Sequence, residues 1–403
     1  MRVALVSSGL IPVPPVKGGA VEEYVYQLSR HLRMLGVDAV VIDANYDNDK
    51  VVYENVNGAQ IVKVPTPKLQ IRFKERIIQE LLFGRAVFKY IDKEGFDIVH
   101  ANTAWVGFTL AMHRGIVRLR SQGLVYACHN PLWPEDKVHT GEKIVRFVES
   151  YAMKSADIVI ALNKTMYKVL AEKVRVSPGK MVIVPNGVDT EYFRPRLKDE
   201  QILSKYELEE QSYILFVGRV SPEKGVHILL QAFKQIANNI PKSFRLVIVG
   251  PLGGAFNFTQ PSSYAEAMMK YAKEKLGERV IFTGAIDKNS LRILYSNAYC
   301  LVLPSFAEAF PMVLLEAMAS GTPPIGSTAG GIPDIIIGGV NGLLFRKEDW
   351  RDLANKLILL ISDKNLRDKL AHSARKFVER NYSWRSITQE IIKVYVSIVE
   401  YAT

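Results

Sequence analysis

The sequence predicts an α/β protein with two doubly wound domains, each built on a parallel sheet, that face each other across a cleft. Short apolar runs rich in β-branched residues alternate with helical patterns along the chain, which is typical of parallel sheets. The alternation breaks once, at the segment 185–189 and the charged stretch that runs on to Glu210, and then starts again. With 403 residues, the chain is also too long for one ordinary hydrophobic core. We therefore expect domains at 1–187 and 188–383, followed by a terminal helix over 384–403.

The first half begins with a strand over 2–7, a proline-rich loop and a helix from Ala20, which Gly36 ends as a C-terminal cap. Gly18 and Gly19 precede this helix, where glycine lets a ligand approach the backbone at the helix N-terminus closely. Two glycines in a loop are also a common turn, and their spacing is not that of the dinucleotide-binding fingerprint. Further strands are expected over 38–42, 60–64, 97–100, 124–128, 157–162 and 181–184. Four further helices are expected between them: two that end near 94 and 120, and two that span 143–154 and 164–173.

The second half repeats this order. The expected strands lie over 213–217, 244–249, 280–282, 298–303, 324–326 and 342–345, and the expected helices over 226–237, 264–276, 291–296 and from 350 onward. From Trp384 onward, apolar residues recur at helical spacing, so the terminal helix needs a surface to pack on.

Composition excludes several classes of protein. Hydrophobic residues make up 48% and charged residues 23%, as in a globular chain. No apolar run reaches the length of a membrane span, and the first residues predict a strand and not a cleavable signal peptide, so we expect a cytoplasmic protein. The two cysteines, Cys128 and Cys300, lie in apolar strand-like runs, which predicts core positions and not a disulfide or a cysteine metal site.

The formal net charge of +11 is compatible with nucleic acid, an anionic membrane or an anionic substrate, and charge alone does not choose among them. Part of the excess lies between Lys63 and Lys93, where basic and apolar residues are interleaved. The basic residues there are Lys63, Lys68, Arg72, Lys74, Arg76, Arg85, Lys89 and Lys93. Two interpretations remain open: an amphipathic helix packed on a sheet with solvated lysines, or a helix that contacts an anionic membrane surface.

Two glutamates eight residues apart, Glu308 and Glu316, bracket a predicted helix start that follows a buried strand. Pro311 is expected at the first helical position. The amides of Met312 and Val313 then point outward at the positive end of the helix dipole, where phosphate or sugar oxygens bind well. Glu316 lies roughly 7 Å along the helix axis from Pro311. The two carboxylates are therefore expected to hold different parts of one elongated ligand.

Arg219 and Lys224 flank the loop after the first strand of the second half. An arginine fork and a lysine point charge on a glycine-bounded turn before a helix suit a diphosphate, although surface charges in a turn give the same pattern. No metal site is expected, because Asp47 and Asp49 lie in a polar turn. Cations and helix dipoles can stabilise phosphate charge without a metal.

His129 and His100 each end a predicted strand of the first half. A histidine at the carboxyl end of a parallel strand faces the cleft, where it can bond a sugar or move a proton. We favour this functional role for His129 and a structural hydrogen bond for His100. Cys128 precedes His129 in an extended strand, so the two side chains point to opposite faces and form no nucleophile–base pair.

Over almost its whole length, the sequence closely resembles the family 4 retaining glycosyltransferases, which have two Rossmann-like domains in the GT-B fold. The resemblance rests on the glycine pair after the first strand, His129, the linker 185–189, Arg219 with Lys224, and the glutamate pair with its Pro-Met-Val interior. It implies an N-terminal acceptor-side domain, a C-terminal nucleotide-sugar donor domain and a terminal helix that returns to the N-terminal domain. The donor-binding residues it implies are Gly18, Gly19, Arg219, Lys224, Phe310, Pro311, Met312, Val313 and Glu316.

The resemblance assigns Glu308 to a hydroxyl of the transferred sugar, Glu316 to the ribose and His129 to the sugar near the reacting carbon. It implies transfer of a hexose from a UDP- or GDP-sugar with retention of configuration and without a metal or other cofactor. We expect a carbohydrate or lipid-linked acceptor, the latter because of the basic and apolar stretch before Lys93, which would place the protein peripherally at the inner face of a membrane. We expect no nucleic acid as a partner. Two departures are Asn130, where an acidic residue is frequent, and Asp334, where glutamate is common.

Two alternatives to transfer remain open. A nucleotide-sugar epimerase or hydrolase shares the two-domain cleft, but the cations and paired glutamates favour transfer. A noncatalytic nucleotide-sugar binding protein would keep the diphosphate clamp while tolerating loss of His129, and this chain carries all of them.

Overall fold

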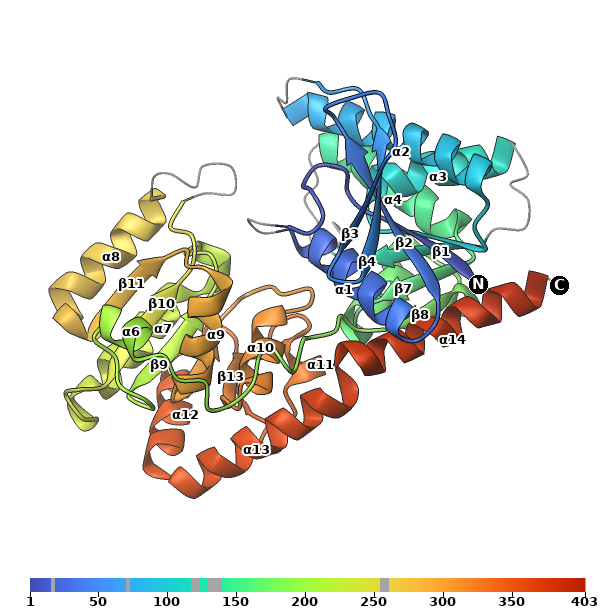
Figure 1. Ribbon diagram of the computed structural model, residues 1–403. Coiled ribbons are helices and arrows are strands. Elements are labelled where there is room, and N and C mark those ends of the chain that lie inside the picture. The colour runs from blue at the N-terminus through green and yellow to red at the C-terminus, as the bar shows by residue number, and fades with distance from the viewer. Residues whose placement is uncertain (16–18, 70–72, 117–122, 130–139, 254–260, 403) are drawn as a thin grey trace. The chain divides into compact units, whose positions relative to one another are not determined.

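The computed structural model describes residues 1–15, 19–69, 73–116, 123–129, 140–253 and 261–402 (Figure 1). Contacts divide the chain into two compact units. The first unit comprises Met1–Gly187 and Trp384–Thr403, and the second comprises Val188–Ser383. Each unit carries one sheet with helices on both faces, which is the doubly wound α/β architecture predicted from the alternating pattern.

The sheet of the first unit has eight strands in the order β3-β4-β2-β1-β5-β6-β7-β8. The strands are β1 (Arg2–Val6), β2 (Asp38–Asn45), β3 (Val52–Val56), β4 (Ala59–Pro65), β5 (Ile98–Ala101), β6 (Gly123–Cys128), β7 (Ile158–Ala161) and β8 (Met181–Ile183). All neighbours pair in parallel except β3 and β4, which form an antiparallel hairpin at one edge. The sequence analysis missed β3, although the Asn57-Gly58 pair between alternating residues is a strong hairpin signal.

The helices of the first unit form a layer on each face of its sheet. They are α1 (Ala20–Met34), α2 (Phe73–Glu94), α3 (Ala104–Ile116), α4 (Thr140–Ser155), α5 (Lys164–Val169), which continues as a π-helix over Leu170–Val174, and the terminal α14 (Trp384–Ala402). Helix α3 packs between α2 and α4 on one face. On the other face, α1 packs against α14, and both bury apolar side chains on β1 and β2. The apolar face of the terminal helix is therefore covered within this unit.

The second unit has a six-stranded parallel sheet in the order β11-β10-β9-β12-β13-β14. Its strands are β9 (Tyr213–Val217), β10 (Arg245–Val249), β11 (Val280–Gly284), β12 (Cys300–Leu303), β13 (Pro324–Ser327) and β14 (Leu343–Phe345). This is the Rossmann order, in which the winding direction reverses between the first and fourth strands, here β9 and β12. Alternate residues of β9 point into two separate cores, Ile214 and Phe216 into one and Leu215 and Val217 into the other.

The helices of the second unit supply the two outer layers. One layer contains α7 (Val226–Ile236), α8 (Ser263–Leu276) and α12 (Trp350–Ser362). The other contains α6 (Glu200–Lys205), α9 (Lys288–Asn297), α10 (Met312–Ala319), α11 (Ile332–Ile335) and α13 (Lys364–Asn381). Helix α6 lies in the charged stretch where the alternating pattern of strands and helices breaks. The carboxylate of Asp199 caps it by accepting from the amides of Gln201 and Ile202, and Leu203 anchors it in the core.

The cysteine prediction is confirmed, because Cys128 and Cys300 are both free thiols and both buried. Burial raises the pKa of the Cys300 thiol to about 12, which makes it inert. Across the described residues, no helix combines the length and the apolar character that crossing a membrane requires.

Candidate active site

Two loops meet at the point where the strand order of the second unit reverses. Strands β9 and β12 are hydrogen-bonded neighbours, so the loops that follow their carboxyl ends lie side by side. The Phe306 amide donates to the Glu223 carbonyl oxygen at 2.8 Å, which ties the two loops together. Ligands of open α/β sheets bind at this kind of position, because the diverging loops leave a crevice at the strand ends.

Two glycines allow the close approach of these loops. Gly225 has φ +69°, and a Cβ atom there would lie 2.1 Å from the Pro304 carbonyl oxygen. Gly330 has φ +51°, and a Cβ atom there would lie 2.2 Å from the Glu308 carbonyl oxygen, which also accepts a hydrogen bond from the Gly331 amide at 2.8 Å. Both positions need glycine for its positive φ and for its missing side chain. The backbone around Glu308 is therefore held from both sides.

Lys224 and Glu308 form an ion pair in this crevice. The Lys224 Nζ atom lies 2.6 Å from Glu308 Oε1, and the two side chains are 23% and 10% exposed. The same carboxylate oxygen accepts a hydrogen bond from the Ser305 hydroxyl at 2.7 Å. Two residues that the sequence analysis assigned to one ligand are thus brought into direct contact across 84 positions of sequence. Ser305 was not predicted, although it lies three residues before Glu308.

Glu316 lies on α10 and is oriented by the neighbouring helix α9. The hydroxyl of the fully buried Tyr295 donates to Glu316 Oε2 at 2.9 Å, while Glu316 itself remains partly exposed. Burial and the nearby carboxylate raise the pKa of Tyr295 well above its usual range, so this hydroxyl stays a donor. The sequence analysis did not identify Tyr295 as a partner, because only the packing of α9 against α10 brings it there.

The predicted position of Pro311 is wrong by one residue. Helix α10 begins at Met312, and Pro311 is its N-cap with ψ 94°, so it still lies in extended backbone. The Leu314 amide bonds the Pro311 carbonyl, which is the first bond of the helix. Phe310, Met312 and Val313 are partly buried and pack at the edge of the core around this helix start.

Arg219 follows β9 and is partly exposed beside Glu223, whose pKa it helps to lower. Within the described chain, no hydrogen bond or ion pair engages its guanidinium group, in contrast to Lys224. The site in the second unit therefore combines one engaged cation, one available cation and two partly exposed carboxylates.

The first unit collects a separate set of polar residues at the carboxyl ends of its strands. His129 follows β6, and its Nε2 atom lies 3.0 Å from Asn102 Oδ1, at the end of β5. The ring of Tyr24 packs edge-on against His129, with ring centroids 4.7 Å apart. Burial lowers the pKa of His129 to about 4, so its imidazole is neutral at physiological pH.

His100 has the structural role that we expected. It is fully buried, and its Nδ1 atom bonds the Tyr395 hydroxyl of α14 at 2.6 Å. Burial, with a contribution from His129, lowers the pKa of His100 to about 3. Its hydrogen bond therefore attaches the terminal helix to the sheet and makes no part of a solvent-facing site.

The glycine pair is only partly described. Gly19 has φ +120° and is the N-cap of α1, and a Cβ atom there would lie 2.7 Å from Glu22 Oε2. Gly18, Arg72 and Asn130, together with the side chain of Lys74, lie outside the described residues. The predicted site residues thus fall into two groups: Gly18, Gly19 and His129 belong to the first unit, and the others belong to the second.

A search for metal ligands in the described chain finds no place where three or more His, Cys, Asp or Glu side chains gather. Asp47 and Asp49 lie in a turn that Asn45 and Asn48 organise through hydrogen bonds.

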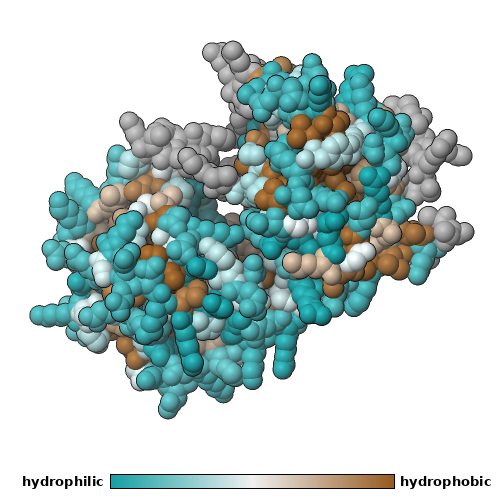
Figure 2. Space-filling view, in the orientation of Figure 1, coloured by the Kyte–Doolittle hydropathy of each residue, from teal (hydrophilic) through white to brown (hydrophobic). Residues whose placement is uncertain are grey.

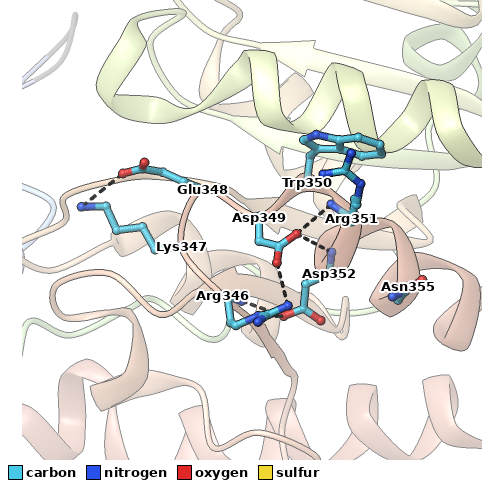
Figure 3. Close-up of a pocket in the computed structure, with 8 residues that line it drawn as sticks. All are labelled: Arg346, Lys347, Glu348, Asp349, Trp350, Arg351, Asp352 and Asn355. Carbon is cyan, nitrogen blue, oxygen red and sulfur yellow. Dashed lines mark hydrogen bonds and ion pairs between the residues drawn. The ribbon is translucent and has the colours of Figure 1, made fainter.

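A separate pocket of about 420 Å³ lies between β14 and the start of α12 (Figure 3). Its lining residues are Arg346, Lys347, Glu348, Asp349, Trp350, Arg351, Asp352 and Asn355. Figure 3 shows that its charges pair with one another, with Arg346 bonded to Asp349 at 2.8 Å. None of the predicted site residues lines this pocket.

Two Rossmann-like units in one chain are the architecture of the GT-B class of glycosyltransferases. The chain matches the model "Glycosyltransferase Family 4" over residues 18–192 and the model "Glycosyl transferases group 1" over residues 198–377. It therefore belongs to the family 4 glycosyltransferases and is a transferase enzyme.

The relatives described next match this chain over nearly all of its length. An uncharacterized glycosyltransferase of Methanocaldococcus jannaschii is 26% identical over 411 residues and covers 99% of both chains. The lipopolysaccharide 1,2-N-acetylglucosaminetransferase of Salmonella typhimurium is 26% identical over 397 residues and covers 96% of both. Among solved structures, sucrose-phosphate synthase from Thermosynechococcus elongatus matches with a TM-score of 0.81 and 25% identity over 100% of both chains.

Proposed function

We propose that this enzyme transfers a hexose from a nucleoside-diphosphate sugar, UDP- or GDP-linked, to an acceptor with retention of anomeric configuration. The observation that carries the proposal is the contact between Lys224 and Glu308, with Arg219 on the same loop. Cations suited to a diphosphate lie directly beside a carboxylate suited to a sugar hydroxyl, as the junction between phosphate and sugar of such a donor requires.

The proposed roles follow from this geometry. Arg219 and Lys224 hold the diphosphate and stabilise the charge that develops on it as the sugar departs. Glu308 accepts a hydrogen bond from a hydroxyl of the sugar. Glu316, held by Tyr295, accepts from the ribose hydroxyls, and the first amides of α10 add donors for sugar or phosphate oxygens.

The first unit is proposed to contribute His129 and the glycine pair before α1. In this proposal His129 contacts the sugar near the reacting carbon and the backbone at Gly19 approaches the diphosphate; the position of Gly19 at the N-cap of α1 supports the second role. The acceptor then attacks on the face from which the diphosphate leaves, and the departing phosphate takes the acceptor proton. Exclusion of water from the occupied site would prevent hydrolysis of the donor.

Two cations and the helix N-terminus can neutralise the diphosphate, so we propose that transfer needs no divalent metal. Chelation with excess EDTA should leave the rate of transfer unchanged. A loss of transfer that Mg²⁺ or Mn²⁺ restores would contradict this part of the proposal.

Product analysis with a donor labelled in the sugar tests the function. Screening nucleoside diphosphates and their sugars by thermal shift first identifies the donor, because a ligand that binds the native state raises the Tm. Labelled sugar on an acceptor, with the anomeric configuration of the donor by NMR, is the expected result. An isomerised nucleotide sugar, free sugar alone or an unchanged donor would instead identify an epimerase, a hydrolase or a noncatalytic binding protein.

For the acceptor, we propose a lipid-linked molecule reached from an anionic membrane surface at the cytoplasmic side. The helices α2, α3 and α4 carry apolar side chains that face solvent. The exposed fractions are 49% for Ile78, 37% for Met112, 57% for Ile144 and 66% for Phe147. Figure 2 shows hydrophobic residues among hydrophilic ones over α2.

Exposed basic residues accompany the apolar ones on α2, namely Arg76, Arg85 and Lys89. This combination favours anionic lipid surfaces, and the relative from Salmonella acts on lipopolysaccharide. Binding to vesicles that contain anionic lipid should fall when these three residues are changed to glutamine. Unchanged binding, or equal binding to neutral vesicles, would leave α2 as an ordinary amphipathic helix.

A further inference from the structure

The side chain of Asn102 is held in one orientation by the backbone around it. Asn102 is 4% exposed and lies directly after β5. Its amide nitrogen donates to the carbonyl oxygens of Val6 at 3.0 Å and His100 at 3.3 Å. A carbonyl oxygen accepts and does not donate, so the end of the amide that faces these two groups must be the NH₂ group. The Oδ1 atom therefore points the other way.

Asn102 Oδ1 faces His129 Nε2 at a distance of 3.0 Å. An amide oxygen only accepts, so the imidazole must supply the proton from Nε2. A neutral imidazole carries one N–H group, and His129 is neutral because burial lowers its pKa to about 4. The remaining nitrogen, Nδ1, then carries a lone pair and is an acceptor.

The described residues around His129 hold the ring but do not use this lone pair. Tyr24 packs edge-on against His129, with an interplanar angle of 69°, and limits rotation of the ring. Among the described residues, none hydrogen-bonds Nδ1. None of these described residues therefore competes with a ligand for the acceptor on Nδ1.

We propose that Asn102 is a positioning residue that fixes the Nε2–H tautomer of His129, so that Nδ1 accepts a hydrogen bond from a hydroxyl of the transferred sugar. This inference rests on the proposed function, because it assumes that His129 contacts the sugar. It also assigns a preference at the contacted position of the sugar: an acceptor nitrogen favours a neutral hydroxyl and disfavours a carboxylate, which has no proton to donate.

The tautomer can be measured directly by NMR on protein labelled with ¹⁵N-histidine. Long-range ¹H–¹⁵N correlations distinguish a protonated ring nitrogen from an unprotonated one, and the His129→Gln variant identifies the His129 signals by their loss. We expect Nε2–H in the wild type at pH 7.5. In Asn102→Leu, which removes the acceptor, we expect a mixture of both tautomers.

The kinetic effect should follow the tautomer. Loss of an outer hydrogen-bond partner of this kind lowers activity by roughly tenfold or more, and we expect this in kcat of Asn102→Leu. The matched control is Asn297→Leu. Asn297 is also 4% exposed, and its amide nitrogen also donates to two carbonyl oxygens, those of Leu197 and Ile293. It should lose stability without any change at His129.

An Nδ1–H tautomer in the wild type, an unchanged tautomer in Asn102→Leu, or an equal fall of kcat in Asn297→Leu would each overturn the inference. The NMR measurement needs no substrate, so it is independent of the proposed function. An Nε2–H tautomer in a protein that transfers no sugar would instead overturn the proposed function, and with it the role given to Nδ1.

Discussion

Changing Glu308 to glutamine should strengthen binding of a nucleoside diphosphate while weakening binding of the corresponding nucleotide sugar. Lys224 is paired with Glu308 at 2.6 Å, so a diphosphate that recruits Lys224 must compete with this carboxylate. When a nucleotide sugar binds, a hydroxyl of its sugar takes the place of Lys224 as the partner of Glu308. A diphosphate without the sugar leaves the negative charge of Glu308 without a counter-charge. The glutamine variant has no such charge, so it avoids this cost in binding free energy.

The size of the effect follows from the geometry of the pair. At 2.6 Å, an effective dielectric constant of about 20 gives an attraction of about 6 kcal/mol before hydration is counted. The side chains are 23% and 10% exposed, so water offsets much of this attraction when the pair separates. We take a net competition of about 1.4 kcal/mol, which corresponds to about a tenfold tighter Kd for the nucleoside diphosphate. The glutamine variant also lacks a charged acceptor for the sugar hydroxyl, which should weaken the binding free energy of the nucleotide sugar by about 1.5–3 kcal/mol. This loss outweighs the gain from the removed competition.

Isothermal titration calorimetry without acceptor measures both affinities in the wild type and in Glu308→Gln. Ser305→Ala is the matched control, because it removes a hydrogen bond to the same carboxylate oxygen without changing its charge. Lys224→Ala and Arg219→Ala should both weaken the nucleoside diphosphate, whereas His129→Ala should hardly affect it. A Glu308→Gln variant that binds the nucleoside diphosphate less tightly than the wild type would refute the competition.

Three further predictions concern stability. Gly225→Ala should lower the free energy of unfolding, measured in urea, by about 2 kcal/mol or more, because φ at this position is +69° and the new Cβ atom would overlap a carbonyl oxygen. The control is Gly277→Ala, where φ is +59° but the Cβ atom would meet open space. It should cost only about 1 kcal/mol. Burial raises the pKa of Glu80 from 4.5 to about 7, so the stability linked to its proton is present below pH 4.5 and lost as the pH rises to 7. The difference in the free energy of unfolding between the wild type and Glu80→Gln, measured in urea, should fall over this pH range and stay level above pH 7. Equal pH profiles of the two proteins would contradict the prediction. Tyr395→Phe should cost about 1–3 kcal/mol by thermal unfolding, because it leaves the buried His100 without its partner on Nδ1, and an unchanged Tm would argue against that bond.

Local patterns in the sequence were sufficient to predict most elements, and they also suggested the candidate site residues. The alternation of apolar strands and amphipathic helices predicts parallel sheets, because a parallel pair needs a crossover. The antiparallel strand β3 was missed despite its Asn57-Gly58 turn, and α6 was missed because a six-residue helix leaves little periodic signal. The start of α10 was misplaced by one residue, since proline is accepted both at the N-cap and at the first helical position.

Which residues touch was decided only by the tertiary structure. Lys224 meets Glu308 because β9 and β12 are neighbours in the sheet, although 84 residues separate the two side chains. Tyr295 meets Glu316 through the packing of α9 on α10, and Asn102 meets His129 because β5 pairs with β6. Sequence spacing determines which side chains lie at the carboxyl end of a strand. Strand order, which is set by the packing of both helix layers on the sheet, determines which of those ends are adjacent. It therefore also determines that Lys224 pairs with Glu308.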